Sequence, residues 1–157
     1  MKPFAAQGRH SHASESAGQT TPLLIPFFSS KVPAGFPSPA LDYVEDRIDL
    51  TKILVPHPLS TFLVQCVGDS MINAFIPPGS MLMVDKSLTP QNNDIVLAVV
   101  NGEFTVKFLK KNDYKCWLIP ANRKFAELEI LPGMDFQVWG VVTNIITSTN
   151  LVKKCML

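Results

Sequence analysis

The pattern of apolar positions changes along the chain. From residue 61 onward, short runs rich in β-branched and aromatic side chains alternate with clusters of Pro, Gly and Asn, which is the pattern of strands separated by turns. Asn101-Gly102, between two such runs, predicts a two-residue hairpin turn. The sequence therefore predicts a mainly β domain. The expected strands are TFLVQCV (61–67), SMLMVD (80–85), DIVLAVV (94–100), EFTVKFL (103–109), CWLIP (116–120) and DFQVWGVVTNII (135–146).

The N-terminal part has a different composition. Residues 1–21 are rich in Ser, Ala, Gly, Gln and His and poor in apolar side chains, so we expect a flexible arm there. The apolar run Leu23–Phe28 is too short, and too interrupted by proline, to span a membrane. Ser38 followed by Pro39 has the form of a helix N-terminus, which predicts a short helix over SPALDYVEDRIDL (38–50).

Charge and cysteine content exclude several classes of protein. The 157 residues carry a formal net charge of +1 and 17% of them are charged, without the basic stripe of a nucleic-acid binder. Cys66, Cys116 and Cys155 have no metal-ligand spacing, and His10 and His12 are an isolated pair in the arm. We therefore expect no metal or other cofactor, no direct sequence-specific DNA binding and no membrane anchor. The cysteines fit the reducing cytoplasm.

Two residues fit the β pattern poorly. Ser70, in VGDSMINAF, follows a strand where the chain turns, and capping such a turn is the ordinary role of a serine there. Lys107 lies in the strand EFTVKFL, on the same face as Thr105 and Leu109. A lysine in a strand is usually solvated. An apolar neighbour such as Leu109 would desolvate it and lower its pKa.

A serine and a lysine can form a catalytic dyad if the lysine is neutral and close to the hydroxyl. At its ordinary pKa of roughly 10.4, about one lysine in two thousand is neutral at pH 7, so burial must lower the pKa. None of the three histidines is a good partner for Ser70, because His57 is flanked by prolines and the others lie in the arm. A Ser-His-Asp hydrolase is therefore not expected.

Several motifs occur in a fixed order: GFPSPALDYVEDRIDL, GDSM, VD at 84–85, DIVLAVVNGEFTVK and WGVVT. Together, from about residue 25 to residue 142, they resemble the UmuD-like members of the LexA-type self-cleaving Ser-Lys peptidases. The resemblance implies a LexA/signal-peptidase-like β-clip catalytic domain with a flexible N-terminal arm. It also implies Ser70 as nucleophile and Lys107 as base, with Thr105 orienting the amine and Met71, beside Ser70, supporting the oxyanion.

The resemblance marks Ala34-Gly35 as the bond that the protein cuts in itself. The residues agree, because Ala34 fits a shallow pocket and Gly35 lets the backbone approach a nucleophile closely. The prolines of VPAGFPSPA (32–40) favour the extended conformation that a protease cleft requires. We therefore expect an arm of residues 1–34, removed by self-cleavage, and a peptidase and dimerisation domain of residues 35–157.

The partners are expectations from the resemblance alone. In this family the RecA filament on single-stranded DNA acts as coprotease, and the processed homodimer joins a UmuC-type DNA polymerase in the error-prone lesion bypass of the SOS response. The arm segment containing Phe27 and Phe28 also resembles the stretch through which relatives touch the replication sliding clamp. The simpler alternative is that these two side chains pack on the domain surface.

Other classes of protein stay open to different degrees. A catalytically silent dimeric module that regulates the DNA damage response would keep the β fold but leave Lys107 charged or misplaced. A type I signal peptidase shares the dyad but needs a membrane anchor, and a protease acting on other proteins leaves the Ala34-Gly35 segment unexplained. A LexA repressor proper is not expected, because only 34 residues precede the proposed cut, without helical periodicity.

Overall fold

The computed structural model of the chain describes residues 22–28, 34–35 and 45–156. The chain forms two compact units, Met1–Thr51 and Lys52–Leu157. The expected flexible arm of residues 1–21 and most of the expected helix over 38–50 lie outside the described residues. None of the helices in the described part of the chain is long and apolar enough to cross a membrane.

The larger unit is built on one antiparallel sheet of seven strands in the order β3-β4-β9-β5-β6-β7-β8. The prediction of a mainly β fold is confirmed, and the structure contains all six predicted strands. The strand β8 and the helix α2 were not predicted. The elements are β3 (Thr61–Gln65), the 3₁₀ turn η1 (Ile72–Ala74), β4 (Met81–Asp85), β5 (Ile95–Val100), β6 (Glu103–Lys111), β7 (Cys116–Ile119), β8 (Leu128–Ile130), β9 (Phe136–Ile146) and α2 (Thr149–Met156).

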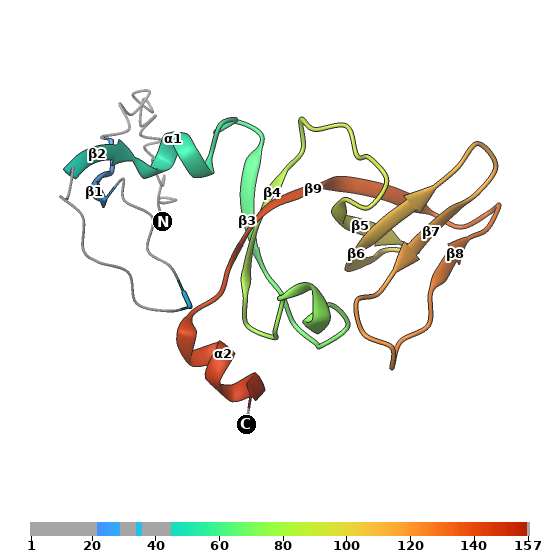
Figure 1. Cartoon of the computed structure of the whole chain (residues 1–157). Coiled ribbons are helices and arrows are strands. Elements are labelled where there is room, and N and C mark those ends of the chain that lie inside the picture. The colour runs from blue at the N-terminus through green and yellow to red at the C-terminus, as the bar shows by residue number, and fades with distance from the viewer. Residues whose placement is uncertain (1–21, 29–33, 36–44, 157) are drawn as a thin grey trace, which may run out of the picture. The chain divides into compact units, whose positions relative to one another are not determined.

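The long strand β9 joins the two halves of this sheet. Its C-terminal half pairs with β4 and its N-terminal half pairs with β5, so that β3 and β4 lie towards one end of the unit and β5 to β8 towards the other (Figure 1). The pairing shifts register at Met83/Val84 and again at Leu97/Ala98. Such irregularities bend the strands and increase their twist, which allows one continuous sheet to curl around its own core.

The predicted hairpin at Asn101-Gly102 is confirmed. Val100 pairs with Glu103 across the turn, and both turn residues have positive φ, 49° at Asn101 and 85° at Gly102. These values belong to the two-residue turn that matches the twist of the flanking strands. The turn therefore fixes the register of β5 against β6, the strand that carries Lys107.

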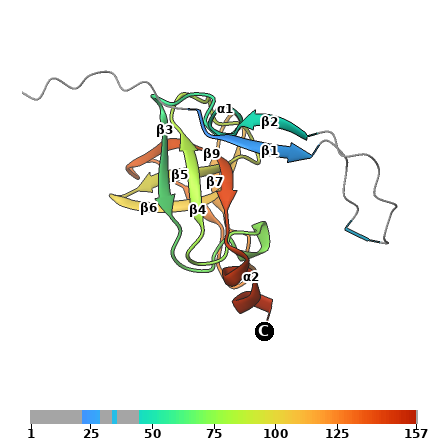
Figure 2. The same ribbon diagram turned by 90° about the vertical axis from the view of Figure 1, so that its left-hand side faces the viewer.

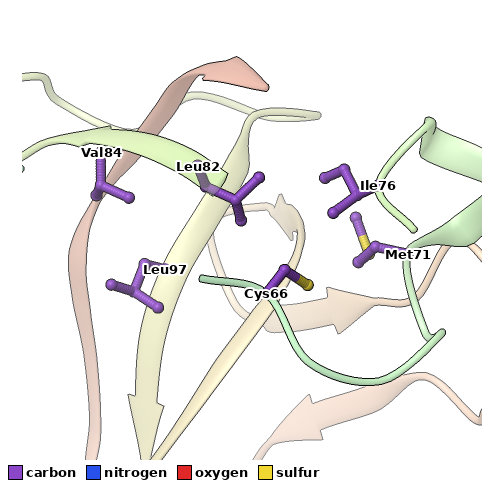
Figure 3. Packing of buried hydrophobic residues seen from close by; sticks show 6 residues of the cluster. All are labelled: Cys66, Met71, Ile76, Leu82, Val84 and Leu97. Atoms are coloured by element: carbon purple, nitrogen blue, oxygen red, sulfur yellow. The ribbon is translucent and has the colours of Figure 1, made fainter. Parts of the chain in front are cut away.

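The main core lies between β3, β4, β5 and the turn after β3. Met71 and Ile76, on either side of η1, are fully buried and lie beside one another (Figure 3). They pack with Cys66, Leu82, Val84 and Leu97. Burying side chains of this size stabilises by about 1.5 to 3 kcal/mol each. The turn that contains Ser70 is therefore held on the core by its next residue, Met71.

The smaller unit contains the two-stranded antiparallel sheet of β1 (Leu24–Phe28) and β2 (Glu45–Asp49), seen side by side in Figure 2. The expected helix is wrong at residues 45–49, which form β2. Its N-terminal signal, Ser38-Pro39, lies outside the described residues, and pairing with β1 stabilises an extended backbone instead. The helix α1 (Leu50–Leu54) begins only after Asp49, whose carboxylate accepts a hydrogen bond of 3.0 Å from the Thr51 N–H.

Candidate active site

Ser70 lies in the turn between β3 and η1. The chain leaves β3 through Gly68, whose φ of +79° suits glycine. Met71 occupies the N-cap position of η1, the residue just before the turn. No side chain donates or accepts a capping hydrogen bond there. The ordinary role considered for Ser70, capping the turn, is therefore not the one observed.

The hydroxyl of Ser70 instead contacts Lys107, in the middle of β6. Lys107 Nζ donates a hydrogen bond of 2.9 Å to Ser70 Oγ. It donates two more, each of 2.9 Å, to Thr105 Oγ1 and to the carbonyl oxygen of Val106. The fold thus brings together three residues that the sequence singled out, although Ser70 and Lys107 are 37 positions apart.

The surroundings of Lys107 favour its neutral form. Burial lowers the pKa of the Lys107 ammonium from its ordinary value, while the negative charge of a Cys66 thiolate would raise it. Burial, however, also raises the pKa of the Cys66 thiol, against the attraction of Lys107. The thiol is therefore uncharged at neutral pH, where it does not stabilise the ammonium.

The turn that holds Ser70 is fixed from the opposite side by the segment after β7. Asn122 Nδ2 donates a hydrogen bond of 3.0 Å to the carbonyl oxygen of Asp69 and reaches Asp69 Oδ2 at 3.3 Å. In the same region, the Asn73 N–H donates to the Ala121 carbonyl at 3.0 Å. The residues on both sides of Ser70 are therefore anchored to a different part of the chain.

The backbone N–H groups of Ser70 and Met71 lie next to the Ser70 hydroxyl along the chain. Among the described residues, the N–H groups of Ser70 and Met71 donate no hydrogen bond, and Met71 itself is buried with 1% of its surface exposed. Backbone donors held rigidly next to a nucleophile can stabilise an oxyanion. The supporting role expected for Met71 stays a prediction, and its side chain has a structural role in the core.

An apolar groove of about 330 Å³ adjoins this site. Cys66 and Thr105, which flank Lys107, form part of its wall, together with the aromatic side chains of Phe62, Phe104 and Trp139. A groove lined mainly by apolar groups with a few polar atoms at one side is typical of a binding site. It has the character expected for an extended segment with apolar side chains.

Ala34 and Gly35 lie in the smaller unit, and both are exposed. No described side chain or backbone atom lies within 4 Å of the position that a Cβ atom on Gly35 would occupy. The backbone here is therefore open to a reacting group. Cleavage of this bond, like the division into residues 1–34 and 35–157, stays a prediction.

Sequence reasoning missed part of the site. Asn122 gives no local signal, because it follows β7 in a loop and reaches Asp69 only through the fold. The Val106 carbonyl is a backbone group that every residue possesses, so nothing in the sequence marks it. The spacing of Cys66 excluded a metal site but gave no sign that this buried thiol lies close to Lys107.

Comparison with known proteins gives the class of the chain. Residues 26–143 match the family described as Peptidase S24-like, so the chain belongs to this family of peptidases. Protein SamA of Salmonella typhimurium is 40% identical over 124 residues, which cover 79% of this chain and 86% of the relative. Protein MucA of Escherichia coli is 39% identical over 131 residues, covering 83% and 89%. These matches confirm the resemblance to UmuD-like proteins.

A repressor is also similar. LexA repressor 2 of Nocardia farcinica is 36% identical over 144 residues, which cover 92% of this chain but 57% of the repressor. The likeness to a repressor therefore does not extend over the repressor's whole length. It agrees with the expectation that this chain shares the LexA-type peptidase fold.

Proposed function

We propose that this protein is a serine peptidase that cuts its own Ala34-Gly35 bond with Ser70 as nucleophile and Lys107 as general base. The observation that carries the proposal is the 2.9 Å hydrogen bond between Lys107 Nζ and Ser70 Oγ, in surroundings that lower the lysine pKa. A serine hydroxyl is a weak nucleophile unless an adjacent base removes its proton. The hydrogen bond supports the required proximity, and burial shifts the Lys107 pKa in the direction of the neutral amine that a general base needs.

The three contacts of Lys107 account for the direction of proton transfer. A neutral amine has two N–H groups and one lone pair. Thr105 Oγ1 and the Val106 carbonyl oxygen can each accept a hydrogen bond from one of the two N–H groups. Neither oxygen then uses the lone pair of the amine. The lone pair then faces Ser70 and takes the hydroxyl proton, while the Ser70 oxygen forms a bond to the Ala34 carbonyl carbon.

The remaining steps follow those of a serine peptidase. The N–H groups of Ser70 and Met71 would stabilise the oxyanion, and the ammonium of Lys107 would return its proton to the amino group of Gly35 as the peptide bond breaks. Water then hydrolyses the acyl-enzyme and releases residues 1–34 with a free carboxylate. The apolar groove beside Cys66 and Thr105 would hold side chains next to the cut.

The cellular role in this proposal is SOS mutagenesis in the cytoplasm. A RecA filament on single-stranded DNA would favour the arm conformation in which Ala34-Gly35 enters the site, which is a shift between populations. The cut homodimer would then act with a UmuC-type DNA polymerase, and the uncut arm would contact the sliding clamp through Phe27 and Phe28. Similarity to protein MucA, protein SamA and a LexA repressor supports this context.

Mass spectrometry of the purified chain tests the chemistry. Incubation at high pH, or at pH 7 with activated RecA filament, should yield one new product, Gly35–Leu157. Ser70→Ala and Lys107→Ala should each abolish the cut, and the double variant should behave like either single one because the residues act together. Lys110→Ala, which removes an exposed lysine of the same strand, is the matched control and should cut normally. A cut elsewhere would disprove the assignment, and its absence under both conditions would favour a silent interaction module.

A further inference from the structure

The small sheet of β1 and β2 joins segments from opposite sides of the proposed cut. Its five residue pairs run from Leu24 with Asp49 to Phe28 with Glu45. The Ala34-Gly35 bond lies in the chain that connects these two strands. After cleavage, β1 would belong to the N-terminal fragment and β2 to the C-terminal one, with no peptide bond between them.

The hydrogen-bond pattern shows which backbone groups of β1 face β2. The Leu50 N–H donates to the Leu23 carbonyl at 3.1 Å, so this pair is one of the hydrogen-bonded pairs of an antiparallel ladder. Such pairs alternate along the strands. The register therefore turns the N–H groups of Ile25 and Phe27 towards β2 and leaves Pro26 at a position whose N–H would point away.

Because of Pro26, β1 can pair with another strand along only one of its two edges. Proline has no N–H group to donate, and a proline at the outer edge of a sheet opposes pairing with a further strand. Because Pro26 lies at an outward position, it leaves the bonds to β2 unaffected. The edge of β2 that faces β1 therefore accepts one strand, and Pro26 opposes growth of the sheet beyond the outer edge of β1.

The side chains define what kind of segment fits this edge. β1 has the sequence LIPFF, without a charged residue, whereas β2 has the sequence EDRID, with three carboxylates and one guanidinium. Ile25 pairs directly with Ile48, which gives an apolar contact across the strands. The acidic strand thus selects an uncharged or basic apolar segment and disfavours an acidic one.

We infer that this edge of β2 is a strand-binding site that β1 occupies in the intact chain and that cleavage opens to an extended apolar segment of a partner protein. The inference rests on the proposed cut at Ala34-Gly35. An isolated two-stranded sheet is marginally stable in water, and the connecting chain keeps β1 near β2 at an effective concentration on the order of millimolar. Cutting the connection removes this advantage, so β1 dissociates on dilution and the N–H and C=O groups of β2 become available.

The test uses the full chain and does not depend on self-cleavage. In a Ser70→Ala chain, residues 37–43 are replaced by the recognition sequence of a site-specific viral protease, which then cuts between β1 and β2. The probe is a fluorescent peptide of residues 22–28, PLLIPFF, followed by two lysines for solubility. Fluorescence anisotropy should show at least about tenfold tighter binding to the cut chain than to the uncut chain, in which β1 competes from the same molecule.

Two N-methylated peptides provide the matched control. Methylation of the Phe27 nitrogen removes an N–H that faces β2 and should weaken binding about tenfold. Methylation of the Phe28 nitrogen changes an N–H at an outward position of the register and should alter binding by less than about twofold. Equal binding to cut and uncut chain, or equal loss with both peptides, would overturn the inference. Self-association of the cut chain that the peptide reverses would make a second copy the occupant and overturn the assignment to a partner protein.

Discussion

At the residue scale, the protonation state of Lys107 should control the rate of cutting. Burial lowers its pKa, and only the neutral amine can accept the Ser70 proton. The rate of unassisted cleavage should therefore rise with pH and level off above the pKa that Lys107 has in the folded chain. Quantitative gel electrophoresis from pH 6 to pH 10 measures this profile, and a flat profile would exclude a lysine base. Lys107→Arg should not cut at any pH, because arginine keeps its proton throughout this range.

Asn122 should act as a positioning residue for Ser70. Its side chain holds the carbonyl of Asp69 at 3.0 Å, and the loss of such a hydrogen bond costs about 1 kcal/mol. Asn122→Ala should slow cleavage about tenfold, because Ser70 spends less time facing Lys107. Asn122→Leu, which keeps the approximate size but loses the donor without adding a charge, should have the same effect.

The pH profile separates positioning from a role in proton transfer. The midpoint of the profile should stay unchanged in both Asn122 variants, because Lys107 keeps its surroundings. Arg123→Ala, at the exposed neighbouring position, serves as control and should cut at the normal rate. A normal rate in Asn122→Ala, or a shifted midpoint, would contradict the positioning role.

At the scale of elements, the sequence predicted strands where alternation and turn residues agreed. β5 and β6 are joined by Asn101-Gly102, so local preferences and the tertiary structure require the same backbone there. β1 and β2 differ, because they pair with one another across a long stretch of sequence, and EDRID has no strong strand preference of its own. A pairing across a long connecting segment cannot be inferred from either sequence alone.

The same distinction applies to the active site. Thr105 and Lys107 share one face of a strand, so their 2.9 Å contact follows from the two-residue period of β structure. The contact of Lys107 with Ser70 was expected from a family resemblance, and that of Asn122 with Asp69 was not expected at all. Both depend on how distant turns meet at the ends of strands, which no local pattern encodes.

Gly140 in β9 should tolerate no larger residue. A Cβ atom at this position would lie 2.7 Å from Val84 Cγ1 and 2.8 Å from the Asp85 carbonyl oxygen, closer than real Cβ contacts. Gly140→Ala should therefore separate β9 from β4 and lower the free energy of unfolding by about 1 to 3 kcal/mol. Urea denaturation measures this change, and Gln137→Ala, at an exposed position on the same strand, should have a much smaller effect. A Gly140→Ala chain with unchanged stability would show that β4 can move away without cost.

Asp85, at the end of β4, should make stability depend on pH in the acid range. It is 1% exposed, accepts a hydrogen bond of 2.7 Å from Ser87 Oγ and one of 2.9 Å from Ser60 Oγ, and lies 2.6 Å from His57 Nδ1. The bond from Ser87 contributes most to lowering the Asp85 pKa below its ordinary value, against the opposing effect of burial, and His57 contributes further.

Because the folded pKa is lowered, Asp85 stabilises the fold above the ordinary aspartate pKa of about 3.9 and loses this effect as the pH falls towards the folded value. Asp85→Asn should therefore be less stable than the original chain at pH 7, and the difference should shrink below about pH 4. Urea midpoints at pH 7, 5 and 3 provide the measurement. Asp113→Asn, which changes an exposed carboxylate, should follow the original chain, and a constant difference at all three pH values would contradict the prediction.

At the scale of the whole molecule, the proposed cleavage site and the proposed catalytic pair belong to units of different construction. The unit with Ser70 and Lys107 has a seven-stranded sheet and a buried core. In the unit with Ala34-Gly35, the described strands form a two-stranded sheet whose apolar side chains Leu24, Ile25 and Phe27 are 38% to 51% exposed. Local stability follows the burial of apolar contacts, so the two units should open at different free energies.

Hydrogen exchange should reveal this difference directly. The amides of Val96 and Ala98 in β5, and of Val141 in β9, lie in buried central strands and should exchange only when the whole unit unfolds. The amides of Ile25 and Phe27 face β2 and should exchange orders of magnitude faster, because a two-stranded sheet opens locally. Exchange followed by nuclear magnetic resonance on the Ser70→Ala chain, which stays uncut, resolves individual amides. Equal protection of β1 and β5 would contradict the prediction, because it would show that the two-stranded sheet is as stable as the core of the larger unit.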